Sequence, residues 1–539
     1  MTAGEHSRSA PDPRRWRALG VCLTALGMTL IDATVVNVAL PSISAGLHAS
    51  PSQLQWVVSG YALAFGMVPI IGGRLGDDRG RRRMLLIGIA SFVLTSAVVG
   101  FAPTAEVLIV ARVLQGVAGG LVNPQVSGIV QLLFSGEERG RAFGALGASV
   151  GLATALGPVI GGLVIGAVGP QFGWRATFLI NVPIGTVAFW LCHRWLPRRV
   201  PRPLGSRGPR LDLPGAGLLA AALFGVLYPA VQFDSTRDPR LALLWVPATA
   251  VLGAFVGWER GPARRRGQAL IDVDLFRIRS YAAGLGLAIL YFGAYAGLPL
   301  VLALYLQDGL GLTPLASGLT ASAYAVGTAV SAPLAGRVVG RLGRRLIVGA
   351  LVVFLAGTAC LVGVALLADR VGPGVVPWLL VGPLVLAGVG GGCVITPNQA
   401  LSLARIDARG GSTAGGMLQT AQRVGAAAGA AVLSAIFYAV LARPAQPGTD
   451  RGYSLAFAAS AAGTCCIGAA ITVGGSRASA ECGTFIGLSA KGGLDTVKAQ
   501  VGGCRRTDCA HNVELACTAP AIRVGAGTDL ADCLTYSER

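Results

Sequence analysis

Fourteen apolar segments follow one another along the chain, and each is about as long as a helix that crosses a lipid bilayer. Such a helix needs about 20 mostly apolar residues. Hydrophobic residues make up 53% of the 539 residues and charged residues only 13%, whereas soluble domains carry about 25% charged residues. The sequence therefore predicts an all-α integral membrane protein. The predicted spans are residues 17–40, 54–73, 84–102, 106–130, 141–166, 174–196, 213–231, 241–258, 281–306, 315–336, 346–368, 374–398, 412–440 and 453–474.

Arginine clusters lie in every second loop between these segments. They precede the first segment and follow the second, fourth, sixth, eighth, tenth and twelfth. Because positively charged loops stay in the cytoplasm, this alternation predicts that both termini are cytoplasmic and that the protein lies in the plasma membrane. The net charge of +19 then reflects topology, and no nucleic-acid partner is expected. The first segment is too long for a secretory signal peptide.

A weak internal repeat predicts two halves. Residues 73–82 have a degenerate copy at residues 336–345, and repeated bundles are typical of secondary transporters. The predicted organisation is two six-helix bundles plus two extra helices. Its parts are a cytoplasmic N-terminus at 1–16, an N-terminal bundle at 17–196, two extra spans with basic loops at 197–280, a C-terminal bundle at 281–475 and a cytoplasmic tail at 476–539.

The tail differs from the rest of the chain. It holds five of the eleven cysteines and the only two lysines, Lys491 and Lys498. Its cysteine spacing does not match the usual paired zinc pattern. Disorder is the expected state, while a reading-frame artefact at the end of the gene and a redox or metal module stay open.

Asp32 is the only carboxylate deep inside an apolar segment. A charge at that depth costs about 2.5–3.5 kcal/mol on insertion scales, so such a residue usually faces a cavity. A carboxylate that takes up and releases protons can exchange a proton for a cationic substrate. Asp32 is therefore the candidate proton-coupling residue. The alternative is a hydrated carboxylate near the extracellular end of the span.

Arg112, Gln422 and Arg423 are further candidate site residues inside predicted spans. Arg112 lies a few residues into the fourth segment, where it can hold a neighbouring helix by hydrogen bonds. Snorkelling to the cytoplasm is disfavoured, because this span runs inward and Arg112 lies in its extracellular half. Gln422 and Arg423 either line a cavity or bridge helices.

Residues 73–82 form the candidate gating loop. Gly73, Gly76 and Gly80 permit a tight connection, and Arg81 belongs to the arginines that keep the loop cytoplasmic. Asp77 can accept hydrogen bonds from a helix N-terminus and pair with an arginine. We interpret the motif as a conformational latch; topology alone is the alternative.

The fifth span is rich in glycine. Gly151, Gly157, Gly161 and Gly162 let helix backbones touch, and Pro158 removes one helix hydrogen bond and bends the helix. Ordinary close packing is the alternative to a functional role.

Five segments resemble motifs of the major facilitator superfamily, and most closely its fourteen-span drug:proton antiporter family. They are residues 30–41 (LIDATVVNVALP), 73–82 (GRLGDDRGRR), 112–116 (RVLQG), 151–162 (GLATALGPVIGG) and 174–185 (WRATFLINVPIG). The motifs occur in family order on the corresponding spans, and the resemblance covers about residues 15–475.

The resemblance implies proton-coupled efflux of drugs or antibiotics by alternating access. It implies that Arg112 belongs to the proton-coupling network, that Gln115 in the same motif is a candidate cavity residue, and that the glycines of the fifth span mark antiport. The use of arginine alone before the tail suggests a GC-rich genome, hence a bacterial exporter. An uncoupled facilitator or channel and an importer of a small metabolite stay open as alternatives.

The expected partners are a small-molecule substrate, protons and the lipid bilayer, and the protein is expected to be a monomer. The sequence lacks the P-loop pattern G-x-x-x-x-G-K-[ST], so the proton gradient is the expected energy source. No cofactor or metal is expected. A membrane-embedded enzyme is disfavoured, because the spans hold neither a histidine cluster nor a Ser/His/Asp set.

Overall fold

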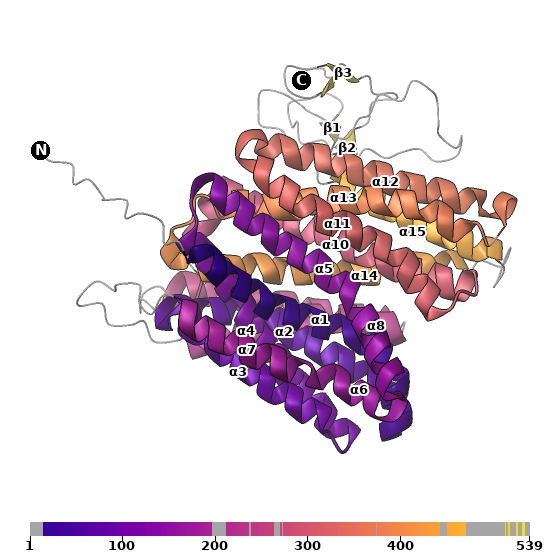
Figure 1. Ribbon diagram of the computed structural model, residues 1–539. Helices are drawn as coiled ribbons and strands as arrows, with labels where there is room; N and C mark the ends of the chain where they lie inside the picture. The colour runs from indigo at the N-terminus through magenta and orange to yellow at the C-terminus, as the bar shows by residue number, and fades with distance from the viewer. Residues whose placement is uncertain are drawn as a thin grey trace, which may run out of the picture. The chain divides into compact units, whose positions relative to one another are not determined.

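The computed structural model describes residues 14–196, 212–236, 239–263, 270–271, 273–372, 374–441 and 450–470, and four short segments between 512 and 533. Apart from short turns and residues 270–271, the chain is helical within the first seven ranges (Figure 1). The helices are α1 (Arg15–Leu47), α2 (Pro51–Arg79), α3 (Arg81–Gly100), α4 (Ala105–Leu133), α5 (Gly136–Val168), α6 (Pro170–Leu179), α7 (Asn181–Trp195), α8 (Leu213–Thr236), α9 (Trp245–Trp258), α10 (Arg279–Leu304), α11 (Pro314–Leu342), α12 (Arg344–Val371), α13 (Val376–Ser402), α14 (Gly411–Leu441) and α15 (Asp450–Ala470).

These helices reproduce the order of the fourteen predicted spans. Only Ile180, which has helical backbone angles, separates α6 from α7, so the two together form the sixth span. Ten of the described helical segments are long and apolar enough to cross a membrane by length and composition. Of the others, α9 has 14 residues, and the apolar part of α8 is residues 213–229. The predicted all-α membrane fold is confirmed.

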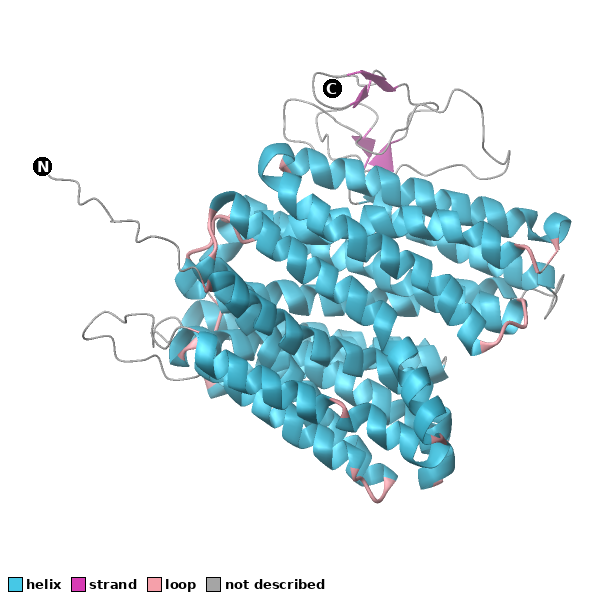
Figure 2. Ribbon diagram, in the orientation of Figure 1, coloured by secondary structure: helices cyan, strands magenta, loops and turns pink. Residues whose placement is uncertain are grey.

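The helices pack as two groups. In the first half α4 packs on α2 and α3, and α1 on α5; in the second half α13 packs on α11 and α12, and α10 on α14. The groups meet where α5 lies against α11 and where α14 lies against α2 and α4 (Figure 2). The inserted helices α8 and α9 pack on each other, and α8 also contacts α2 and α14.

The structure corrects the interpretation of residues 73–82 as a loop. Helix α2 continues to Arg79, six residues beyond the predicted end of its span. Gly73, Gly76 and Asp77 are therefore helical, and only Gly80, with φ 101°, makes the turn. Gly73 and Gly76 serve close helix contact: a Cβ on Gly73 would lie 2.9 Å from the Cα of Thr413, and one on Gly76 would overlap the side chain of Gln125.

The chain from Cys465 to Arg539 forms a separate unit. Its described strands make two antiparallel pairs, β1 (Asn512–Val513) with β2 (Ala516–Cys517) and β3 (Val524–Ala526) with β4 (Ala531–Cys533). The sequence interpretation did not anticipate these strands. The rest of the tail, for which disorder is expected, lies outside the described residues.

Candidate functional site

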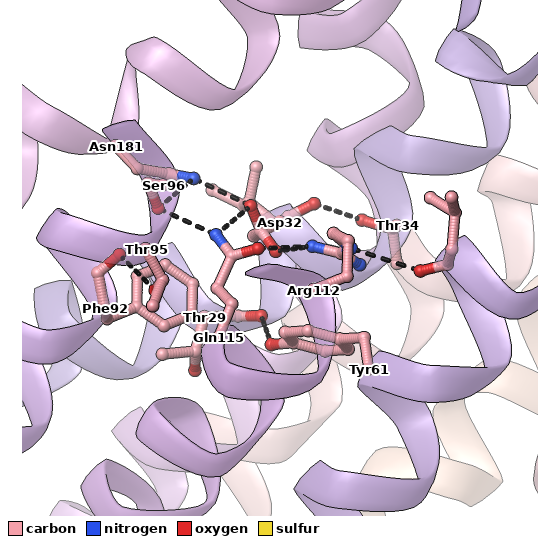
Figure 3. Close-up of polar contacts among 12 residues, drawn as sticks. Thr29, Asp32, Thr34, Tyr61, Phe92, Thr95, Ser96, Arg112, Gln115 and Asn181 are labelled. Atoms are coloured by element: carbon pink, nitrogen blue, oxygen red, sulfur yellow. Dashed lines mark hydrogen bonds and ion pairs between the residues drawn. The ribbon is translucent and has the colours of Figure 1, made fainter. Parts of the chain in front are cut away.

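A buried polar network surrounds Asp32 of α1 (Figure 3). Arg112 Nη1 donates to Asp32 Oδ2 over 2.5 Å. Gln115 Nε2 and Asn181 Nδ2 donate to Asp32 Oδ1 over 3.1 and 2.7 Å. Ser96 joins the network by accepting a hydrogen bond from Gln115 Nε2 over 2.7 Å. Helices α1, α3, α4 and α7 thus each contribute a side chain to one site.

Arg112 is held from several directions. Its Nε donates to the carbonyl of Val57 over 3.2 Å, and its Nη1 also donates to Gln115 Oε1 over 2.8 Å. Its guanidinium carbon lies 4.2 Å from the ring centroid of Tyr61 and 5.4 Å from that of Phe178. Nη2 is buried without a hydrogen-bond partner among the described residues. One donor is therefore free to take a second acceptor when the network rearranges.

Burial decides between the alternatives for the two charged residues. The side chains of Asp32 and Arg112 are both 0% exposed. Neither side chain reaches the surface of the described structure, which argues against a solvent-exposed Asp32 and a snorkelling Arg112. Removing one member of a buried ion pair costs about 3–5 kcal/mol, because it leaves the other charge uncompensated. Neutralising the Asp32 carboxylate would leave the charge of Arg112 uncompensated in the same way.

The glycine face of α5 contacts helices of both halves. A Cβ on Gly157 would overlap Thr34, and one on Gly161 would lie 2.8 Å from Cγ2 of Val35. Thr34 and Val35 follow Asp32 on α1, so these glycines bring α5 against the helix that carries the carboxylate. A Cβ on Gly151 would instead lie 2.9 Å from the backbone nitrogen of Ala329 in α11.

Two other residues of the α5 motif have different surroundings. A Cβ added to Gly162 would meet nothing within 4 Å among the described residues, so close backbone approach does not explain this glycine. Pro158 lies inside α5, where it removes a helix hydrogen bond.

Asp77 joins the two halves at the end of α2. The backbone N–H groups of Ser412 and Thr413 donate to its carboxylate over 3.1 and 2.8 Å, and the Thr413 hydroxyl donates over 2.8 Å. Both donor residues belong to the first turn of α14. A carboxylate at a helix N-terminus is stabilised by the helix dipole, so Asp77 binds the second half through the end of one helix.

Arg81 completes this contact. Its Nη2 pairs with Asp77 Oδ1 over 2.8 Å, and its Nη1 donates to the carbonyl of Gly128 in α4 over 2.6 Å. It also donates to the carbonyl of Ala408, just before α14. The side chains of Asp77 and Arg81 are 6% and 9% exposed. We call Asp77, Arg81, Ser412 and Thr413 the latch.

The candidate cavity residues divide between two places. Gln115 belongs to the network around Asp32. Arg423 of α14 lies across from α2, with its guanidinium carbon 4.4 Å from the ring centroid of Phe65. Gln422 Nε2 is buried without a partner among the described residues.

Sequence reasoning missed three members of the network. Asn181 lies within residues 174–185, but no feature of that motif distinguishes it from its neighbours. Ser96 and Tyr61 carried no signal, because single Ser and Tyr residues are common in membrane helices. A search for polar residues inside the other predicted spans could have identified Ser96 and Asn181.

A set of long apolar helices that packs as two bundles, with a charged pair buried inside one of them, has the architecture of a multi-span membrane transporter. The family profile of the Major Facilitator Superfamily matches residues 18–430 and, in an overlapping match, 283–473. The chain belongs to this superfamily.

Relatives of similar sequence carry names that refer to transport, resistance or export. The "Probable actinorhodin transporter" of Streptomyces coelicolor is 39% identical over 448 residues, which cover 83% of this chain and 76% of the relative. The "Puromycin resistance protein pur8" of Streptomyces alboniger is 36% identical and covers 83% of this chain and 89% of the relative. The "Tetracenomycin C resistance and export protein" of Streptomyces glaucescens is 33% identical over 78% of this chain and 76% of the relative.

Two solved structures share the fold. The human organic anion transporter MFSD10 has a TM-score of 0.58 at 16% identity, and the match covers 85% of this chain and 100% of that one. The proton:xylose symporter XylE has a TM-score of 0.55 at 14% identity, over 83% of this chain and 94% of that one. At these identities the likeness concerns the fold alone.

Proposed function

We propose that this protein exports small molecules such as antibiotics from the cell in exchange for protons. It works as a monomer in the plasma membrane with both termini in the cytoplasm, and the proton gradient drives it without ATP or a cofactor. The observation that carries the proposal is the ion pair of Asp32 and Arg112, which is buried inside the first half.

Protonation of Asp32 is the coupling step. Ionised Asp32 accepts from Arg112, Gln115 and Asn181. When a proton neutralises the carboxylate, the pair with Arg112 is lost and the guanidinium takes other acceptors. Because α1 and α4 carry the two groups, this change alters how the two helices pack. Each proton that enters supplies about 2.3 kcal/mol per 100 mV of membrane potential.

The latch links this step to the conformation of the whole protein. In the predicted topology the ends of α2 and α14 that carry Asp77 and Thr413 face the cytoplasm. The latch therefore closes the cytoplasmic side in the described conformation. Opening to the cytoplasm requires Asp77 to leave the end of α14, and closing restores its three hydrogen bonds.

The names of the relatives support export over import. The three Streptomyces relatives are named for transport, resistance or export of an antibiotic, and the glycine motif of α5 supports antiport through the family resemblance. An uncoupled facilitator has no use for a buried carboxylate that can be protonated. Which compound is exported is decided by a susceptibility panel in a pump-deficient bacterial host, with puromycin and tetracenomycin C among the compounds.

The coupling step is tested by Asp32→Asn in everted membrane vesicles with an imposed pH gradient. Asn keeps the size of the side chain and removes the charge, so uphill transport of the compound found in the panel should fall to background. Downhill exchange of the same compound should persist. Glu106→Gln is the matched control, because Glu106 is an exposed carboxylate at the start of α4. Unchanged gradient-driven transport by Asp32→Asn would refute proton coupling at this residue.

A further inference from the structure

Arg423 is a half-buried cation that no carboxylate neutralises among the described residues. Arg423 lies near the middle of α14 and close to α2. A Cβ added to Gly66 of α2 would lie 3.5 Å from the Cβ of Arg423. Its contact with a described side chain is the face of the Phe65 ring, at 4.4 Å. A charge at membrane depth normally pairs with another group or faces a water-filled cavity. Arg423 therefore needs an explanation that helix packing does not give.

The charges of the span interiors do not balance. Asp32 is the one carboxylate in the interior of the described helices, because the other acidic residues on them lie in first or last turns. Asp32 is committed to Arg112. Arg423 is left over, so the interior between α2 and α14 is positive. Gln422 Nε2, a further buried donor without a described partner, lies next to it in the chain.

Two stacked rings connect Arg423 to the coupling site. The ring of Phe65 stacks on that of Tyr61, with centroids 5.6 Å apart and planes inclined by 16°. Arg112 lies over Tyr61 at 4.2 Å, and Arg423 over Phe65 at 4.4 Å. The row thus runs from Asp32 through one guanidinium and two rings to a second guanidinium on the other half of the protein.

We propose that Arg423 binds the acidic group of an anionic aromatic substrate. A guanidinium can keep its face on a ring while its edge donates two N–H bonds to a carboxylate or an ionised phenol. The aromatic part of the substrate lies beside Phe65 and Tyr61. The inference rests on the proposed function in one respect, that the space between the two halves admits the substrate. The expected substrate is therefore an anion, whereas Asp32 considered alone led us to expect a cation.

The test uses two dyes that share the xanthene ring system. Fluorescein is an anion at neutral pH and rhodamine 123 is a cation. Binding to the purified full-length protein is measured by fluorescence anisotropy at low ionic strength. The wild type should prefer fluorescein by about tenfold or more, the usual effect of a charge-assisted hydrogen bond.

Variants then assign the preference to Arg423. Arg423→Gln should lose the preference by weakening fluorescein binding alone, while Arg423→Lys should keep part of it. Arg370→Gln is the matched control, because Arg370 is an exposed arginine in the last turn of α12. If Arg423→Gln does not fold, the partial loss in Arg423→Lys decides the same question.

Several results would overturn the inference. The wild type could bind neither dye, or it could prefer rhodamine 123. The Arg423→Gln variant could lose affinity for both dyes equally, or it could keep the full preference for fluorescein. The proposed function fails separately. If the wild type prefers fluorescein through Arg423 but a pH gradient drives no transport, the proposed binding site is supported and proton-coupled export is refuted.

Discussion

Two turns, each built on a glycine with positive φ, join α2 to α3 and α11 to α12, and they bind the opposite half in different ways. Gly80 has φ 101° and Gly343 has φ 52°, conformations that L-residues rarely adopt. The two glycines belong to the two copies of the internal repeat, residues 73–82 and 336–345, and the copies differ three residues before each glycine. The first has Asp77 and the second has Gly340.

The first copy binds through side chains. Asp77 accepts from the first turn of α14, and Arg81 donates to α4 and to the segment before α14. Hydrogen bonds and ion pairs of this kind can break in water and form again. A polar latch therefore suits a contact that opens in every transport cycle.

The second copy binds through backbone. A Cβ on Gly336 of α11 would lie 2.5 Å from the carbonyl oxygen of Gly140 and 2.8 Å from Cα of Gly144, both in α5. We call the contact of Gly336, Gly140 and Gly144 the seam. Dispersion contacts at this range depend on exact fit. In the proposed transport cycle the latch would open and close while the seam would act as a pivot.

The largest effect is expected at the seam. Gly336→Val places three carbons where α5 backbone now lies, and overpacking of this kind costs about 1–3 kcal/mol or more. Because the seam is the proposed pivot between the halves, transport should be lost altogether and the Tm of the purified protein should fall. Thermal unfolding and efflux assays measure the two effects.

Gly349→Val is the control for this substitution. A Cβ on Gly349 of α12 would meet nothing within 4 Å among the described residues, so the same change should leave Tm and efflux near the wild-type values. A Gly336→Val protein with normal Tm and normal efflux would show that the seam separates during transport, and the two contacts would then be alike.

A smaller, more selective effect is expected at the latch. Asp77→Asn keeps the shape of the side chain but weakens its pairing with Arg81 and the end of α14. Loss of a buried charge-assisted contact costs about 1.5–3 kcal/mol, so the rate of efflux should fall about tenfold or more. Asp77 lies at the end of a helix and not at midplane, so substrate affinity in detergent should stay within about twofold. Affinity that falls as much as rate would place Asp77 in the substrate site.

The sequence predicted the outline of the fold because spans and loops differ in composition. Apolar length located all fourteen helical segments, and of the three glycines expected to make the connection after the second span, Gly80 does make the turn. The boundary of α2 was wrong, since a helix can continue into cytoplasm through residues such as Arg74 and Asp77 that disfavour the bilayer. The roles assigned to Gly73 and Gly76 were wrong for the same reason.

The candidate site was only partly predictable. Asp32 and Arg112 stand out separately, because each is a charge in an apolar segment, but 80 residues separate them and no sequence pattern shows that they form a pair. The contact of Asp77 with Thr413 spans 336 residues. The proton-coupling and gating roles of these residues stay predictions.

The smallest effect is expected from giving the second turn the acid of the first. Gly340→Asp puts a carboxylate on an exposed position in the last turn of α11, where the new Cβ would lie 3.4 Å from Cγ of Glu137. The first turn of α5 already carries Glu137 and Glu138, so its N-terminus has no need of another acid. Like charges at such distances on exposed surfaces cost about 0.2–0.5 kcal/mol, which changes efflux by about twofold or less.

In an Asp77→Asn background the new acid should restore nothing, since it faces α5 and cannot reach α14. Efflux of the single and double variants, at matched membrane abundance, measures this. Recovery of the double variant would mean that either turn can hold the halves together, and the distinction between latch and seam would be lost.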